Sequence, residues 1–228
     1  MPHIKNVDNH RRLARAIGAA LLAAFGLAIY QTIAANDDAL GAAAQESVQA
    51  FADVMRSRML IDAIGVGLAA FVAIGFYFLL QPVNALLSLV ASALRFLAAV
   101  FSGYGIYVAN SVIAESSNAS TDALGAAINS LNALNFDLFH WGLIASSLGA
   151  ALSFALLYVG RFVPRLLAGY GVIASIGAVI GASAIYLAPA ISEAMFPAYV
   201  AANALAYVSL TIWLLVFGVN VEHWIARA

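Results

Sequence analysis

The chain has 228 residues, of which 64% are apolar and 9% are charged, and its formal net charge is −1. Soluble domains carry about 25% charged residues, so this composition excludes a soluble globular protein and indicates a polytopic membrane protein. The small net charge argues against a nucleic-acid partner, which would need a basic face. The absence of cysteine excludes disulfides, iron–sulfur clusters and cysteine-ligated zinc.

Apolar runs long enough to cross a hydrocarbon core of about 30 Å follow one another along the chain. They cover about residues 16–35, 59–80, 85–113, 136–159, 166–188 and 198–219. We therefore predict one all-α domain over residues 1–228, built as a bundle of six transmembrane helices. Tight turns at residues 81–84 and 160–165 should make antiparallel hairpins of spans two and three, and of spans four and five.

The two longer connections carry helical patterns of their own. In residues 36–58, apolar side chains recur at Leu40, Ala44 and Val48, with polar side chains opposite. This spacing predicts an amphipathic helix on the outer face of the membrane, and a helical loop packed over the mouth of the bundle is the alternative. Residues 115–135 are polar and carry a short helical pattern.

Lysine and arginine are distributed unequally between the two sides of the predicted bundle. One side holds Lys5, Arg11, Arg12, Arg15, Arg161, Arg165 and Arg227, whereas the other holds Arg56 and Arg58 with most of the acids. The positive-inside rule therefore predicts that both termini are cytoplasmic. The expected location is the inner membrane of a bacterium.

Three stretches of the chain resemble segments of a bacterial membrane family, the domain of unknown function 4386: LLQPVNALLSLVASALRFLAAV, FDLFHWGLI and YVGRFVPRLLAGYGVIASIG. The family pattern has a proline turn before span three, an arginine within it, and a histidine that opens span four. These features fall on Pro82, Arg95 and His140, and the family's L-P-R turn corresponds to Val163-Pro164-Arg165. Where the family often has a glutamate after the arginine, this chain has Ala98. The resemblance implies the fold and the location, and it implies no activity.

Arg95 is a permanently charged residue near the middle of the third span. It lies about 12 residues beyond the Pro82 turn, or roughly 19 Å along the helix axis, close to the middle of the bilayer. Asp62, the acid within span two, should lie about 12 Å away along the membrane normal. The residues expected level with Arg95 are instead uncharged: Tyr30, Ser146, Ser147, Ser153, Ser175 and Tyr207.

We assign a candidate ligand-binding set to this depth, consisting of Arg95, Ser92, Ser102, Ser175 and Tyr207. Three interpretations of Arg95 are open. It bonds carbonyls and hydroxyls and holds the bundle together, it faces a cavity and binds an anion or a lipid headgroup, or it pairs with an acid of another subunit.

A second polar group is expected at the outer ends of the spans, formed by Asp62, Tyr107, Asp137 and His140. A histidine with two carboxylates can form a metal site or a proton relay. We favour an interfacial cap in contact with water, and assign no metal ligand, no cofactor and no catalytic residue. His140 is the one histidine within a span and Lys5 is the sole lysine, which argues against transmembrane bis-histidine haem and a retinal Schiff base.

These observations favour a non-enzymatic membrane protein that binds a lipid or a hydrophobic anion in a cavity lined by spans two to five. The alternative is an accessory subunit of a larger membrane complex, which would dock through the small-residue face of Gly177 and Gly181. The partner could also be a second copy of this chain. An intramembrane enzyme using Asp137 and His140 is the least supported hypothesis.

Overall fold

A computed structural model describes residues 2–34, 48–116 and 121–220. This part of the chain contains helices and no strand. The helices are α1 (Pro2–Ala34), α3 (Val48–Leu80), α4 (Ala85–Ser116), α5 (Thr121–Gly160), α6 (Arg165–Leu187) and α7 (Pro189–Val216). All six are long and apolar enough to cross a membrane, so the predicted all-α fold of six transmembrane helices is confirmed.

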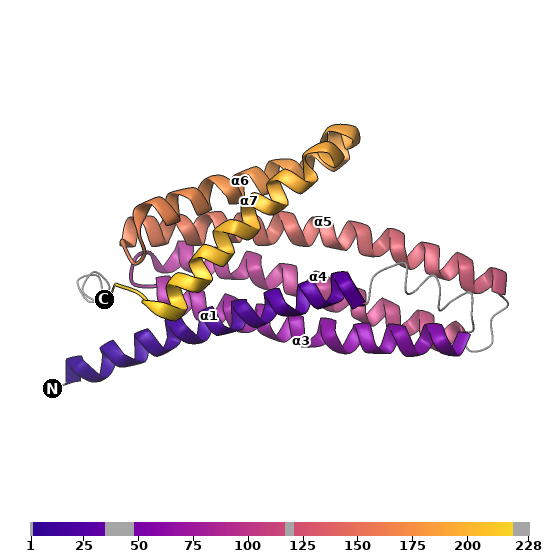
Figure 1. Cartoon of the computed structure of the whole chain (residues 1–228), viewed down its shortest axis with the longest axis horizontal. Helices are drawn as coiled ribbons and strands as arrows, with labels where there is room; N and C mark the ends of the chain where they lie inside the picture. Colours follow the sequence, from indigo (N-terminus) through magenta and orange to yellow (C-terminus); the bar gives the residue numbers. More distant parts are fainter. Residues whose placement is uncertain (1, 35–47, 117–120, 221–228) are drawn as a thin grey trace.

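The helices form a ring in chain order. Each helix packs against the next one that is described, and α7 packs against α1 and closes the ring. α3 also makes a smaller contact with α5 across the interior. Figure 1 shows that α1 begins and α7 ends at the same end of the bundle, and that the last turns of α7 lie over α1 while its start lies away from it.

Two tight turns lie at this end, which we call the turn end; the opposite end is the loop end. In the α3–α4 turn, the Oδ1 atom of Asn84 accepts a hydrogen bond from the backbone N–H of Leu87 at 2.9 Å and caps α4. In the α5–α6 turn, Arg161 has a positive φ of 56°, and the N–H of Phe162 reaches the carbonyl of Leu157. This backbone pattern commonly ends a helix, so both predicted hairpins are present.

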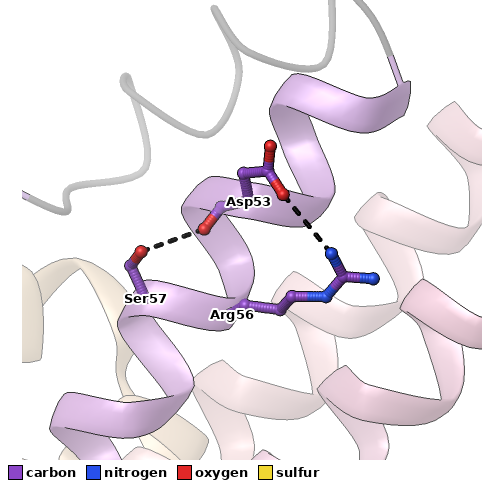
Figure 2. Close-up of polar contacts among 3 residues, drawn as sticks. All are labelled: Asp53, Arg56 and Ser57. Carbon is purple, nitrogen blue, oxygen red and sulfur yellow. Dashed lines mark hydrogen bonds and ion pairs between the residues drawn. The ribbon is translucent and has the colours of Figure 1, made fainter.

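Four helices begin earlier in the chain than the predicted spans. α1 begins at Pro2, α3 at Val48, α5 at Thr121 and α7 at Pro189. Residues 48–58 therefore continue the second span as one helix, and residues 36–47 of the predicted amphipathic helix lie outside the described residues. Figure 2 shows two contacts with helical spacing in this segment. The Asp53 carboxylate pairs with Arg56, three residues later, at 3.3 Å, and the Asp53 backbone carbonyl accepts a hydrogen bond from Ser57, four residues later, at 3.0 Å.

The extended helices continue past the thickness of a bilayer core. α5 has 40 residues, or roughly 60 Å at 1.5 Å per residue, against a core of about 30 Å. Figure 1 shows α3 and α5 reaching beyond the end of α1. A small apolar cluster of Ala52, Met55, Ala109 and Leu131 packs α3, α4 and α5 together there. This packing explains why the polar connection before residue 136 is helical.

The main core fills the turn end. Phe76, Phe154 and Phe162 are fully buried there, within a cluster that draws on α1, α3, α5, α6 and α7. The glycines at these crossings allow close approach. A Cβ on Gly75 would lie 2.7 Å from Ile17, and one on Gly171 would overlap the ring of Phe154. The turn end is therefore densely packed, and the cavities described next lie toward the loop end.

Candidate functional site

Arg95 connects helices across the ring. Its side chain is 7% exposed, and its Nε donates a hydrogen bond to Ser153 Oγ on α5 at 3.2 Å. Nη1 donates to Tyr207 Oη on α7 at 3.1 Å. The guanidinium carbon lies 4.7 Å from the ring centroid of Phe76 on α3, a cation–π distance. One side chain of α4 thus contacts α3, α5 and α7.

The partners of Arg95 are held in place by their own contacts. Ser153 Oγ donates to the carbonyl of Gly149 at 2.7 Å, which leaves its lone pairs to accept from Arg95. The ring of Tyr207 meets Phe25 of α1 and Phe154 of α5 edge-on, with centroids 6.4 and 5.9 Å apart. These contacts fix both hydroxyls where the guanidinium needs acceptors.

The charge of Arg95 is incompletely compensated. Both of its hydrogen-bond acceptors are neutral hydroxyls, and Nη2 is buried without a hydrogen-bond partner in the described part of the chain. Ser88 Oγ donates to the carbonyl of Tyr77, so these two residues lie level in the antiparallel hairpin. Counting seven residues along each helix from this contact places Ala70 of α3 level with Arg95. Asp62 is eight residues farther toward the loop end, or about 12 Å. An unsatisfied buried donor on a charged group carries a substantial energetic cost.

A cavity of about 420 Å³ extends from Arg95 toward the loop end, between α1, α3, α4 and α5. Its walls are mainly aliphatic, with Leu21 and Leu27 on α1 and Val66 on α3, and its polar side chains are Asp62, Arg95, Ser102 and Ser146. The lining differs from the predicted one because α1, and not α6, forms a wall. α6 packs on the other side of α5, where Gly171 receives the ring of Phe154.

A smaller cavity of about 160 Å³ adjoins it between the loop-end portions of α3, α4 and α5. The two share the lining residues Asp62, Ser102, Leu138 and Phe139. The smaller cavity adds the polar side chains of Arg58, Asn132 and Asn135. The larger, mainly apolar cavity thus reaches Arg95, and the smaller, more polar cavity lies on its loop-end side.

The candidate ligand-binding residues divide into two groups. Tyr207 bonds Arg95, and Ser102 lines both cavities while its Oγ bonds the carbonyl of Ala98 at 3.3 Å. Ser92 and Ser175 are buried without a hydrogen-bond partner for Oγ within the described residues, and they line neither cavity. The structure therefore brings Tyr207 to Arg95 itself and Ser102 to the cavity, and leaves Ser92 and Ser175 in helix interfaces.

The predicted outer polar group does not come together as one cluster. Asp62 lines the cavities, whereas Tyr107 is 70% exposed and stacks on Tyr104. Asp137 is exposed, and His140 is buried among aromatic rings on the side of α5 that faces α6 and α7. In the described residues no three histidine, aspartate or glutamate side chains gather into a metal-binding group.

Sequence reasoning missed Phe76 and Gly149 as parts of the site. A Cβ on Gly149 would lie 2.6 Å from the carbonyl oxygen of Ala91 and 2.9 Å from Arg95 Cγ. Gly149 therefore lets α5 lie directly against the turn of α4 that carries Arg95. The spacing of Gly142 and Gly149, two turns apart on one face of α5, was the available signal for a close helix contact.

Six membrane-length helices closed into a ring around a buried arginine define a polytopic integral membrane protein. The family described as Domain of unknown function (DUF4386) matches residues 16–218, and the chain belongs to that family. The predicted family is confirmed. No curated protein and no solved structure matches the chain.

Proposed function

We propose that this protein binds a hydrophobic anion, either a free amphiphile or a membrane lipid, in the cavity that ends at Arg95. One observation carries the proposal: a mainly aliphatic cavity of about 420 Å³ reaches a buried guanidinium that has only neutral hydrogen-bond partners. Ligand pockets of about 300–1,000 Å³ with few polar groups are typical of small-molecule sites. An ionisable residue inside a membrane bundle is a functional candidate by default.

The chemistry of the ligand follows from the two ends of this cavity. The aliphatic walls favour an apolar body, and a carboxylate or phosphate matches the paired N–H groups of a guanidinium. Because Nη2 is buried, the guanidinium must turn from Ser153 toward the cavity for the anion to reach it. The ligand then replaces a neutral partner with a charged one, which is the source of the binding energy.

Native mass spectrometry of the protein in lipid nanodiscs, before any delipidating step, tests the proposal. The wild-type protein should carry a stoichiometric anionic molecule, and Arg95→Gln should lose it. Arg56→Gln is the matched control, because Arg56 is an exposed arginine of α3 paired with Asp53, and it should retain the ligand. The mass of the ligand distinguishes a phospholipid from a free amphiphile, and a bare wild-type monomer would contradict the proposal.

The accessory-subunit alternative receives less support from helix packing. A Cβ on Gly181 would overlap the ring of Tyr199 on α7, so this half of the Gly177–Gly181 face packs inside the chain. Of these two glycines, Gly177 is the one with open space in front of it for a partner to approach. A reproducible protein partner in the same nanodiscs would favour that alternative.

We also propose that the turn end faces the cytoplasm of a bacterial inner membrane. Arg161 and Arg165 lie in and beside the α5–α6 turn at this end, while Asp53 lies near the start of α3 at the loop end. The chain has no cysteine, so a single introduced cysteine is the one thiol of the protein that a maleimide can label. A membrane-impermeant maleimide should label Asp53→Cys in intact spheroplasts and Gln81→Cys only after permeabilisation, and the reverse pattern would overturn this orientation.

A further inference from the structure

A third pocket, of about 340 Å³, lies on the other side of α5 from the body of the Arg95 cavity. It is formed by α5 and by the loop-end portions of α6 and α7. Its lining combines apolar side chains with three polar ones: Phe136, Phe139, Ile185 and Phe196, with His140 from α5 and Ser192 and Glu193 from α7. Phe139 also lines the Arg95 cavity and so stands between the two sites.

His140 presents an oriented hydrogen-bond acceptor to this pocket. The residue is 4% exposed, and its Nδ1 lies 2.8 Å from the carbonyl oxygen of Phe136. A carbonyl can only accept, so Nδ1 must carry the proton and donate. In the neutral ring Nε2, at the far end from the helix backbone, is then the acceptor. No other hydrogen bond to this ring comes from the described residues.

The remaining polar groups of the pocket are also acceptors. Ser192 Oγ donates its hydrogen to the carbonyl of Gly181 at 2.8 Å and keeps only lone pairs for a ligand. Glu193, when ionised, is an acceptor-only carboxylate. A ligand that matches this pocket must therefore supply O–H or N–H donors.

The walls of the pocket select a flat ring. Phe136 lies 4.2 Å from the His140 ring, centroid to centroid, and Phe139 lies at 5.3 Å and 87° to it. Such aromatic surroundings favour stacked or edge-on contact with another ring. A cavity of about 150 Å³ is enough for benzene, so about 340 Å³ accommodates a substituted ring.

The surroundings also indicate where the ligand comes from. Trp141 and Tyr186 stack beside the pocket with centroids 5.3 Å apart, and both are exposed. Exposed tryptophan and tyrosine on membrane helices mark the lipid–water boundary, where amphipathic phenols collect. We propose that this pocket binds the head group of a lipid-soluble phenol or hydroquinone, with the ligand O–H donating to Nε2 of His140.

Nitrogen NMR of the histidine-labelled protein in nanodiscs tests the contact directly. Adding a decyl-substituted hydroquinone under argon should shift the Nε2 resonance of His140, assigned as the signal lost in His140→Phe. The dimethyl ether of the same compound has no O–H to donate, and it should leave the resonance in place. An unshifted Nε2 signal at saturating hydroquinone would overturn the proposal.

Affinity measurements supply the second test. One neutral hydrogen bond corresponds to about a two- to tenfold change in the dissociation constant, so His140→Phe should weaken hydroquinone binding by about that factor. The oxidised quinone and the dimethyl ether should bind the wild-type protein correspondingly more weakly. Arg95→Gln should leave hydroquinone binding unchanged, which separates this site from the proposed anion site. Equal affinity for the hydroquinone and its dimethyl ether would contradict the inference.

Discussion

Replacing Gly149 by alanine tests whether the close contact of α4 and α5 positions Arg95. The new Cβ would lie 2.6 Å from the carbonyl oxygen of Ala91, whereas ordinary contact begins at 3.4 Å. The obstructing atoms are the carbonyl oxygen of Ala91 and Cγ of Arg95, and neither is the end of a flexible side chain. The two helices must therefore move apart by about 0.8 Å, the difference between the ordinary contact distance and the distance to the carbonyl oxygen. Overpacking of this kind costs about 1–3 kcal/mol, and the shift moves Arg95 away from Ser153.

Gly142→Ala is the control for this variant. Gly142 lies on the same face of α5, but its nearest neighbour, the carbonyl oxygen of Ala98, would be 3.8 Å from the new Cβ. Both variants gain the same helix propensity of about 1 kcal/mol, so their difference isolates the clash. For a chain of this size we expect Gly149→Ala to unfold about 2–12 °C below Gly142→Ala in matched detergent micelles. Equal melting temperatures would refute this account of the contact.

Three further substitutions probe the packing of the ring. Tyr207→Phe removes an acceptor from Arg95 and should lower the free energy of unfolding by about 1–3 kcal/mol, while Tyr104→Phe, at an exposed ring, should change it little in the same denaturant titration. Gly181→Ala should lower the melting temperature because its Cβ meets the Tyr199 ring, while Gly177→Ala, with open space before it, should not; equal effects would contradict this assignment. Arg95→Met should leave the ligand-free protein as stable as wild type or more stable, since an incompletely paired buried charge costs more than its hydrogen bonds return; a large loss measured by unfolding would show that the arginine is structural.

The hairpins were the most predictable part of the fold. Spans two and three end and begin beside Pro82, and the structure ends α3 at Leu80 and begins α4 at Ala85. The last span was predicted to begin at about residue 198, and its helix begins nine residues earlier, at Pro189. Proline is tolerated in the first turn of a helix, and α7 begins at Pro189 and continues through Pro197.

The depth of the site was more predictable than its walls. A helix rises by a fixed amount per residue, so counting from the turns was enough to bring Ser153 and Tyr207 to the level of Arg95. Which faces meet is a different matter, because alanine- and glycine-rich helices allow several packing orders. The sequence therefore did not reveal that α1 lines the cavity or that His140 faces α6 and α7.

The position of Arg95 links the two halves of the bundle. On its turn-end side Phe76 and Phe154 are fully buried in the main core, and on its loop-end side the cavity opens. A residue meant only to join helices would be expected to have its donors satisfied, since an unpaired buried donor lowers stability. Arg95, whose Nη2 has no hydrogen-bond partner among the described residues, lies at the boundary between the packed half and the hollow half. Proteins retain such local costs chiefly at functional sites, which is the physical reason for the proposal that Arg95 binds a ligand as well as joining helices.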